Sequence, residues 1–304
     1  MRRVVVTGAA GLLGGYVADA FEGGADTVGL DVRPAASGRE HVVTSILDLD
    51  AVATAFRGAD SVMHVAAAAN ITAGSPREIV ERNALGTWTV LEAALRAGVR
   101  RVVLCSTDSV LGNTVWRDHV WCPQQVPVPE DHPLRPADPY GLSKLMAEEA
   151  GRSYALRGLE VLALRPVFIL FQGMMGEVRA RHAAPDAYSG PCAGGHVAAG
   201  GGPFWHHVDP RDVAEAFRLA EAVPWAGFDA FWLAAPSTLQ PTPTLDRMRE
   251  VFGRLPDRID TGLYETAPFA PLFDIRRAAQ KLGWTPQFDH RAAVVDRSPA
   301  LARE

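Results

Sequence analysis

The feature that most constrains the fold is a glycine-rich stretch near the N-terminus, Thr7 to Gly14 (TGAAGLLG). It follows Arg2 to Val6, a β-branched run that predicts a buried strand, and it leads into apolar residues at helical spacing that begin at Leu13. Glycines between a strand and a helix let the backbone come close to a ligand, and the first amides of the helix then point at that ligand. Because glycines also form ordinary turns, the motif needs a second feature before it indicates a binding site.

The second feature is an acidic residue at the end of the next strand. Thr27 to Leu30 predict this strand, and Asp31 follows it, about 20 residues beyond the glycine motif, where a carboxylate holds the ribose hydroxyls of a dinucleotide. The two features together predict a dinucleotide-binding unit with the pyrophosphate at the start of the first helix.

The alternation of strand and helix continues along the chain and predicts an α/β fold. Further strands are predicted at 41–44, 61–66, 101–105 and 160–164, and helices at 79–95 and from Tyr140 onward. We therefore expect a doubly wound parallel sheet of the Rossmann type, with helices on both faces.

The C-terminal part has a different pattern. From Phe171 the periodicity is weak, and six glycines between 190 and 202 indicate either a mobile loop, such as a lid, or a disordered insertion. Helices are predicted at 209–222, 244–252 and 274–282, and a strand at 231–234. We expect a dinucleotide-binding domain over 1–166, rejoined by part of 205–235, and a smaller substrate-binding lobe over most of 167–304.

Composition excludes several classes of function. The chain of 304 residues has a net charge of −5, which argues against a nucleic-acid partner, and it has no apolar run long enough to span a membrane. Its three cysteines, Cys105, Cys122 and Cys192, are too few and too scattered for a disulfide framework, so we expect a cytoplasmic protein. The pair His206-His207 lacks partner ligands at metal spacing, and we expect no metal.

Polar residues near the predicted carboxyl edge of the sheet indicate the chemistry. Thr107 follows the fifth strand, and Tyr140 and Lys144 lie one helical turn apart on a shared face. A tyrosine has a pKa near 10 and is a poor base at neutral pH, but an ammonium group and a positive nicotinamide ring would together lower that pKa. With Thr107 orienting a carbinol oxygen, the three residues predict a hydride-transfer site with Tyr140 as general base.

These motifs, together with others that follow in the family's order, resemble those of an extended short-chain dehydrogenase/reductase of the NAD-dependent epimerase/dehydratase type. The matching segments are TGAAGLLG (7–14), Asp31, Asp48-Leu49, HVAA (64–67), Asn83 with Gly86-Thr87, STDSVLG (106–112), PYGLSK (139–144), LRP (164–166), HVDPRDVA (207–214) and KLGWTP (281–286). They span nearly the whole chain.

The resemblance implies NAD as the cofactor and a role for each matching residue. Gly8, Gly11 and Gly14 would contact the pyrophosphate, and Leu12 and Leu13 of the same turn would also bind the cofactor. Asp31 would hold the adenosine ribose, Asp48 and Leu49 would face the adenine, and Ala66 and Ala67 would line the path to the nicotinamide. Thr107, Tyr140 and Lys144 would be catalytic, with Asn83 and Asp108 in support, and Lys144 would also reach the nicotinamide ribose. The family commonly forms homodimers through the helices that bear Asn83 and Tyr140.

Three departures from the family pattern bear on the reaction. Ser109 stands where dehydratases carry a glutamate base, which disfavours dehydration, and Leu111 replaces a common tyrosine of the substrate pocket. The segment 203–206 lacks an arginine that often binds a nucleotide diphosphate, although Arg165, Arg179, Arg181 or Arg211 are alternatives. An insertion at 113–121 carries Trp116 and Trp121, for which we favour packing over a role in covering a sugar ring.

The leading hypothesis is NAD-dependent oxidation of a sugar carbinol within a nucleotide-sugar epimerase. The alternative is a net dehydrogenase that acts on a free sugar acid or a related alcohol. A dehydratase and a non-catalytic NAD sensor are the remaining alternatives, and the intact set Thr107, Tyr140 and Lys144 argues against the sensor.

Overall fold

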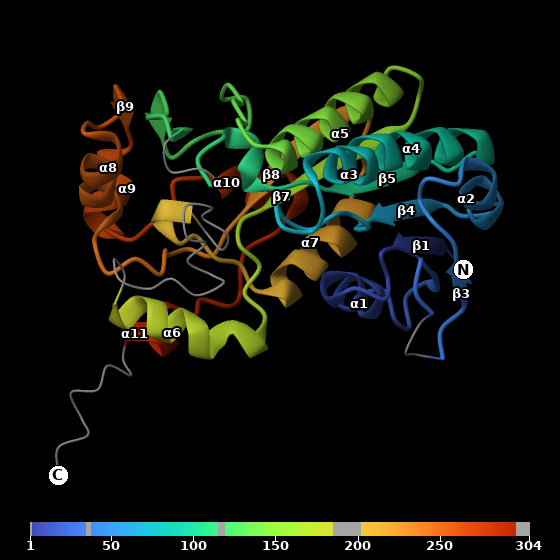
Figure 1. Ribbon diagram of the computed structural model, residues 1–304, viewed down its shortest axis with the longest axis horizontal. Helices are drawn as coiled ribbons and strands as arrows, with labels where there is room; N and C mark the ends of the chain where they lie inside the picture. Colours follow the sequence, from blue (N-terminus) through green and yellow to red (C-terminus); the bar gives the residue numbers. More distant parts are fainter. Residues whose placement is uncertain (1, 35–37, 115–118, 185–201, 296–304) are drawn as a thin grey trace, which may run out of the picture.

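The computed structural model describes residues 2–34, 38–114, 119–184 and 202–295. A seven-stranded sheet runs through its centre in the order β3-β2-β1-β4-β5-β7-β8, and every neighbouring pair is parallel (Figure 1). The strands are β1 (Arg3–Thr7), β2 (Asp26–Asp31), β3 (His41–Val43), β4 (Ser61–His64), β5 (Arg101–Cys105), β7 (Glu160–Pro166) and β8 (Phe228–Leu233). The predicted doubly wound parallel sheet is confirmed.

Helices cover both faces of the sheet, which is why its central strands are continuous apolar runs. One face packs on α1 (Leu12–Asp19) and α7 (Pro210–Ala222), and the other on α2 (Leu49–Ala55), α4 (Gly86–Ala97) and α5 (Pro139–Ala155). Two separate hydrophobic cores result, one on each face. Val4, Val6 and Phe217 belong to the first, and Val5 and Leu91 to the second.

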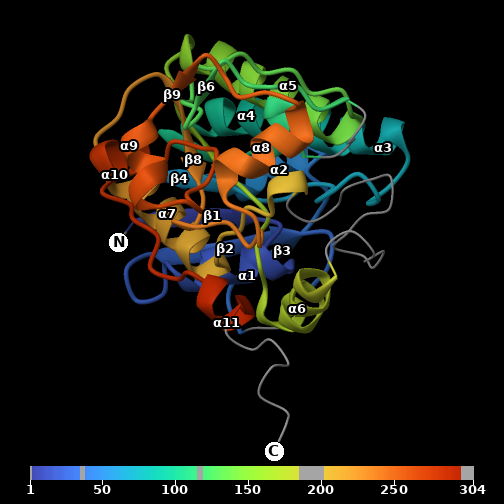
Figure 2. The same cartoon turned by 90° about the vertical axis from the view of Figure 1, so that its left-hand side faces the viewer.

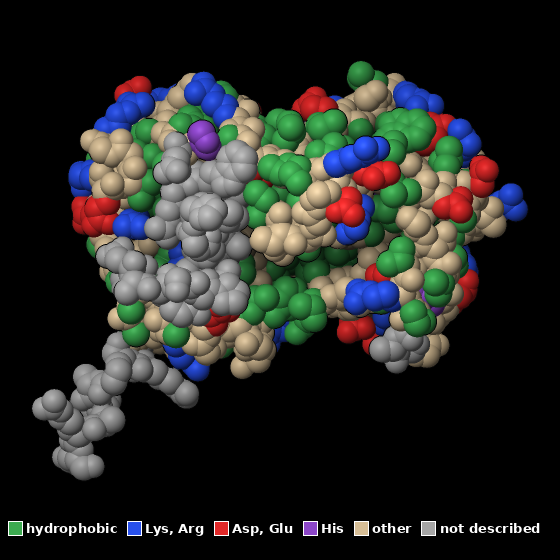
Figure 3. Space-filling model, viewed as in Figure 1, with side chains coloured by type: hydrophobic (Ala, Val, Ile, Leu, Met, Phe, Trp, Pro, Cys, Tyr) green, Lys and Arg blue, Asp and Glu red, His purple; other side chains and the backbone are tan. Residues whose placement is uncertain are grey.

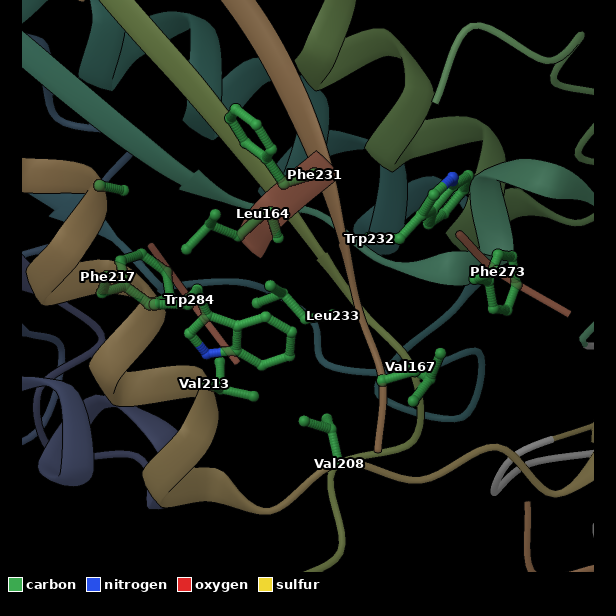
Figure 4. Packing of buried hydrophobic residues seen from close by; sticks show 14 of the residues in the cluster. Leu164, Val167, Val208, Val213, Phe217, Phe231, Trp232, Leu233, Phe273 and Trp284 are labelled. Carbon is green, nitrogen blue, oxygen red and sulfur yellow. The ribbon is translucent and has the colours of Figure 1, made fainter. Parts of the chain in front are cut away.

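The first core continues beyond the sheet into the C-terminal part of the chain. Trp284 packs with Val213 and Phe217 of α7, and Trp232 of β8 meets Phe273 at 4.5 Å between ring centroids (Figure 4). The remaining elements are α3 (Pro76–Val80), α6 (Met175–Ala183), α8 (Thr244–Phe252), α9 (Thr261–Thr266), α10 (Arg276–Leu282), α11 (Arg291–Val295), and the pair β6 (Gln125–Val126) and β9 (Arg258–Ile259). Figure 2 shows α6 and α11 near each other below the sheet.

Some elements differ from the sequence predictions. The segment after Phe171, predicted to be loop, contains α6, and the pairing of β6 with β9 was not predicted. The single helix predicted at 79–95 is α3, then a π-helical turn η1 (Glu81–Leu85), then α4. Residues 190–201 lie outside the described part of the chain. No helix within that part has the length and apolarity needed to cross a bilayer.

The glycine-rich turn is built by close backbone contacts. Gly8 has φ +74°, and a Cβ at this residue would lie 2.7 Å from the Ala66 nitrogen. A Cβ at Gly14 would lie 1.9 Å from the Gly8 carbonyl oxygen. Both positions therefore exclude any side chain, and the first turn of α1 lies directly on the loop that leaves β1.

We predict that Gly14→Ala destabilises the fold by at least about 1–3 kcal/mol, because its Cβ overlaps a backbone oxygen that cannot move away. Gly15→Ala is the matched control, since nothing lies within 4 Å of its added Cβ, and we expect it to be neutral or stabilising by up to about 1 kcal/mol. Thermal and urea unfolding measure both variants. Equal stability of the two would contradict this account of the turn.

Candidate functional site

The helix α5 carries Tyr140 and Lys144 to the end of β5. Asp138 caps the helix by accepting from the Gly141 amide at 2.8 Å, and Pro139 occupies the first helical position, where its missing N–H costs nothing. A Cβ at Gly141 would lie 2.6 Å from the Ser109 carbonyl oxygen. Gly141 thus allows the helix to approach the turn after β5 at backbone contact, a role that the sequence analysis did not assign.

The three predicted catalytic side chains meet at this approach. The Tyr140 phenol is half-buried and lies close enough to the Thr107 hydroxyl for that hydroxyl to act on its pKa. Lys144, also buried, donates from Nζ to the Cys105 carbonyl oxygen at 2.7 Å, which ties α5 to the last residue of β5. Thr107, Tyr140 and Lys144 thus all lie at the end of β5, and their catalytic roles stay a prediction. The sheet edge beside them is hollowed between α1 and the α3–α4 layer, with hydrophobic side chains in view (Figure 3).

The pKa of Tyr140 departs from the sequence expectation. Burial raises the pKa of the phenol above its ordinary value and the nearby Cys105 thiol raises it further, while the hydrogen bond with Thr107 acts in the opposite direction. Burial also lowers the pKa of Lys144. The protein groups alone keep Tyr140 protonated, so a lowered pKa requires the positive charge of a bound nicotinamide ring.

Asp108 lies beside this group and is buried. Its Oδ1 accepts from the Thr107 hydroxyl at 3.1 Å, and its Oδ2, although buried, has no hydrogen-bond partner in the described part of the chain. Burial raises the pKa of this carboxyl from 3.8 to about 7. Asp108 therefore presents a polar atom that a ligand hydroxyl would satisfy.

Asn83 acts on the site through the backbone. From the π-helical turn η1 its amide oxygen accepts from the Ala68 amide at 2.7 Å, and its Nδ2 donates to the Ala68 carbonyl oxygen and, at 3.0 Å, to the Ser143 hydroxyl of α5. These bonds join the loop after β4 to the helix that bears Tyr140. Asn83 is therefore a positioning residue in this structure.

His64 also links the segments that form the site. The sequence analysis noted this histidine only as part of the segment HVAA. One ring nitrogen bonds the Thr7 hydroxyl at 2.8 Å and the other bonds the Thr87 hydroxyl at 3.0 Å, and Thr7 in turn accepts from the Ala66 amide at 3.2 Å. Burial lowers the pKa of this histidine to about 3. The neutral imidazole links the glycine turn to α4, and nothing in the local sequence marks that connection.

The residues predicted for the dinucleotide line the carboxyl ends of β1 and β2. Asp31 is 8 % exposed, and its two oxygens accept from the backbone amides of Ala10 at 3.1 Å and Arg33 at 3.0 Å. Both amides hold the carboxylate at the rim of the glycine turn, where the exposed Leu12 also lies. Leu13 packs its side chain into the core, so it offers only its backbone to a ligand. Asp48 is the N-terminal cap of α2. The glycine cradle, which any Cβ would fill, and this placed carboxylate fit a dinucleotide.

The four arginines considered for a nucleotide diphosphate have partners within the protein. Two of them form ion pairs, Arg165 with Glu148 at 2.7 Å and Arg211 with Asp209 at 2.8 Å. Arg181 donates to the Gly202 carbonyl oxygen, and its guanidinium lies 4.0 Å from the centre of the Trp205 ring. Arg179 donates to the Ala293 carbonyl oxygen at 3.3 Å. The side chain of Arg165 is completely buried in its ion pair, which argues against this residue as a ligand contact.

Two other predictions from the sequence concern packing. Trp121 donates from its ring to the Leu111 carbonyl oxygen at 2.9 Å and stacks on His132, so packing is confirmed for this tryptophan, whereas Trp116 lies outside the described residues. His206 accepts from the Leu272 amide at 3.1 Å, which makes it a core hydrogen-bond acceptor.

Comparison with known proteins agrees with this geometry. Residues 4–223 match the model of the NAD dependent epimerase/dehydratase family. The chain belongs to this family. Its parallel sheet with helices on both faces is the fold that the sequence resemblance implied.

Several characterised proteins of the family are similar to this chain. They are the L-arabinose 1-dehydrogenase (NAD(P)(+)) of Haloferax volcanii (37% identical, covering 56% of this chain and 68% of that protein), the UDP-glucose 4-epimerase of Azospirillum brasilense (34%, covering 52% and 47%) and the uronate dehydrogenase of Pseudomonas putida (31%, covering 54% and 59%). The chain thus spans between about half and two thirds of the length of these relatives.

A solved structure extends the likeness to nearly the whole fold. A short-chain dehydrogenase/reductase superfamily protein from Agrobacterium tumefaciens, crystallised with bound NAD, is 26% identical, with a TM-score of 0.68 over 97% of this chain and 95% of that one. The part of the chain beyond residue 223 therefore also has a counterpart in a solved structure.

We predict that the buried Asp108 makes the stability of the fold depend on pH. Because its pKa is raised to about 7 in the folded state, the carboxyl stabilises the fold below about pH 4 and loses that contribution as the pH rises through 7. A tenfold change in proton affinity is worth about 1.4 kcal/mol, so the loss should reach a few kcal/mol. Unfolding of the wild type and Asp108→Asn between pH 4 and 8 should show the wild type losing stability relative to the variant, and a constant difference would contradict the account.

Proposed function

We propose that this protein catalyses NAD-dependent oxidation of a sugar carbinol by hydride transfer. The observation that carries the proposal is the meeting of Tyr140, Thr107 and Lys144 at the end of β5, beside a glycine turn and an acidic residue that fit a dinucleotide. NAD, when bound, supplies the hydride acceptor and a positive ring. Every other part of the chemistry is carried by side chains of this chain.

The roles follow from the contacts around Tyr140. Tyr140, as the phenolate, accepts the proton of the substrate hydroxyl, and Thr107, which lies beside it, orients the same oxygen. Lys144 is fixed by the Cys105 carbonyl oxygen, and its ammonium favours the phenolate. The free Oδ2 of Asp108 accepts from or donates to a second hydroxyl of the sugar, according to its protonation. Asn83 fixes the loop after β4 to α5 through its hydrogen bonds with Ala68 and Ser143.

The net reaction has two candidates, a nucleotide-sugar epimerase and a dehydrogenase of a free sugar or sugar acid. The partners of the four candidate arginines favour the dehydrogenase, because a diphosphate would have to displace an existing contact at each of them. The similar proteins include both sugar dehydrogenases and UDP-glucose 4-epimerases, so these relatives do not separate the two candidates. We propose the dehydrogenase, and the epimerase remains the alternative.

A panel of L-arabinose, galacturonate and UDP-glucose separates these candidates. We expect NADH to accumulate with a free sugar or uronate, and not with UDP-glucose. Mass spectrometry of the denatured protein is the companion measurement. Near-stoichiometric NAD together with conversion of UDP-glucose to its epimer, without net NADH, would overturn the dehydrogenase in favour of the epimerase.

We predict that Tyr140→Phe lowers kcat by about 10²–10⁴-fold while the Kd for NAD changes little, since a phenyl ring removes the proton acceptor and keeps the packing. Tyr154→Phe is the control on the same helix, because Tyr154 bonds Glu92 and does not face Thr107. Steady-state kinetics and NAD titration measure both. Full activity of Tyr140→Phe would disprove the assigned base.

The preferred cofactor depends on Asp31, which would repel a ribose 2′-phosphate. We therefore propose NAD as the better ligand and predict that Asp31→Ala weakens NAD at least about tenfold relative to NADP, as expected for the loss of charge-assisted hydrogen bonds. The ratio of the two dissociation constants is the measurement. An unchanged ratio would remove Asp31 from cofactor selection.

We also propose that two copies of this chain pair through η1, α4 and α5. Four large apolar side chains are exposed there, Leu85 and Trp88 at 49% and 42% and Leu142 and Met146 at 44% each, and hydrophobic side chains gather over α4 and α5 in Figure 3. A cytoplasmic homodimer remains our proposal for the working form. The dimer would bury the outer side of the helix that bears Tyr140.

We predict that Trp88→Glu converts the dimer to a monomer, because a charge would be buried in an apolar contact. Leu156→Glu is the matched control: Leu156 is 91% exposed at the far end of α5, and its substitution should leave the dimer intact. Sedimentation velocity distinguishes the two. A monomeric wild-type protein would refute the proposed interface.

A further inference from the structure

Helix α5 carries three functional groups at successive turns, Tyr140, Lys144 and Glu148. Tyr140 lies beside Thr107, and Lys144 donates to the Cys105 carbonyl oxygen, as described above. The proposed function gives a role to the first two of these groups and none to Glu148.

Glu148 is fully buried and accepts a hydrogen bond from the turn after β5. Its Oε1 atom accepts from the hydroxyl of Ser106, and the Ser106 amide donates to the Leu164 carbonyl oxygen of β7 at 2.7 Å. Ser106 stands between Cys105 and Thr107 in the chain. Three consecutive residues at the end of β5 therefore each meet a different group of α5.

Arg165 of β7 holds the Glu148 carboxylate in one orientation. Its Nε atom donates to Oε1 at 2.9 Å and its Nη2 atom donates to Oε2 at 2.7 Å, a two-point geometry that fixes the plane of the carboxylate. The remaining Nη1 atom donates to the Glu130 carbonyl oxygen at 2.9 Å, and the guanidinium lies 4.6 Å from the centre of the Trp232 ring. Both members of the ion pair are removed from water and held on several sides.

Stability alone does not explain a buried ion pair at this place. The cost of removing two charges from water offsets most of their attraction, and apolar side chains of similar volume often stabilise a fold equally well. What the pair provides is direction, because a carboxylate fixed by Arg165 offers its oxygen to the Ser106 hydroxyl at one position along α5.

Glycines on both sides of Glu148 let α5 pack tightly against its neighbours. A Cβ at Gly151 would lie 3.0 Å from a methyl group of Val161, and one at Gly141 would lie 2.6 Å from the Ser109 carbonyl oxygen. The helix is therefore in close contact with β7 after Glu148 and with the turn that follows β5 before it. The hydrogen bond between Glu148 and Ser106 joins these two contacts.

We propose that Glu148 is a positioning residue for hydride transfer, which acts through the Ser106 hydroxyl and fixes Thr107 relative to Tyr140 on its own helix. The proposal rests on the proposed function for the roles of Thr107 and Tyr140. Because Glu148 is fully buried, it affects the reaction without touching the substrate. Loss of its bond to Ser106 should slow the chemical step and leave the binding of NAD unchanged.

The first variant is Ser106→Ala, which removes the hydroxyl and leaves the ion pair of Glu148 with Arg165 in place. With the sugar of the substrate panel that is converted fastest, we expect kcat to fall about tenfold, while KM and the Kd for NAD change less than about twofold, because only the geometry at the reacting oxygen is altered. Ser106→Thr keeps a hydroxyl and should recover most of kcat.

The second variant, Glu148→Gln, tests the glutamate itself through a double-mutant cycle. If Glu148 acts through Ser106, then Glu148→Gln should lower kcat less in the Ser106→Ala protein than in the wild type. Glu148→Gln also leaves Arg165 buried without a countercharge. If that variant does not fold, Ser106→Ala and its reversal by Ser106→Thr decide the question.

Ser61→Ala is the matched control. Ser61, at the start of β4, is also buried and donates to a buried glutamate, Glu221, which pairs with Arg2. This second set lies at the amino ends of the strands, at the opposite edge of the sheet from Thr107. Its loss should therefore leave kcat unchanged, and thermal unfolding measures the stability of every variant.

Three results are decisive. A fall in kcat in Ser106→Ala, reversed by Ser106→Thr and absent from Ser61→Ala, supports the proposal. Wild-type kcat in Ser106→Ala overturns it and leaves the proposed function intact, as does a loss that appears only in KM or in the Kd for NAD. Wild-type protein that converts no sugar of the panel overturns both the role of Glu148 and the proposed function.

Discussion

The close approach of α5 to the end of β5 is the contact on which the site depends. It requires Gly141, because a side chain there would overlap the Ser109 carbonyl oxygen, and it is secured by the bond from Lys144 to the Cys105 carbonyl oxygen. Tyr140 is thereby placed against Thr107. A helix displaced by even about one ångström would separate the phenol from the hydroxyl that orients the substrate.

The parallel sheet brings this contact close to the cofactor end of the fold. β1, β4 and β5 are neighbours, so the glycine turn, the loop at Ala66 to Ala68 and the Thr107 turn leave the sheet along one edge. Buried polar bonds link them: His64 joins Thr7 to α4, and Asn83 joins Ala68 to α5. These linking side chains are buried and hydrogen-bonded, which makes the site rigid. Among the described residues of the site, Asp108 carries a buried oxygen, Oδ2, that has no hydrogen-bond partner.

Local patterns predicted the strands, the glycine turn, Asp31 and the Tyr140 helix, because burial and turn formation depend there on neighbours in sequence. The features that the sequence analysis did not predict depend on residues far apart in the chain. The pairing of β6 with β9 joins segments that are distant in the sequence, and Arg165 finds its partner Glu148 on α5, 17 residues earlier in the chain. The raised pKa of Tyr140 follows from burial, whereas the sequence analysis considered only the two positive charges, Lys144 and the nicotinamide ring, that would lower it. Helix α6 was missed because its apolar face is narrow and few of its residues are buried.

The measurement that tests the central claim most directly is isotope transfer. The sugars of the substrate panel, each carrying deuterium on its oxidisable carbon, are incubated with the protein and NAD, and the nicotinamide is analysed by mass spectrometry. The account predicts deuterium in the reduced nicotinamide with the wild type, and transfer that is about 10²–10⁴-fold slower with Tyr140→Phe. A sugar that is converted while its deuterium never reaches the nicotinamide would contradict hydride transfer at this site.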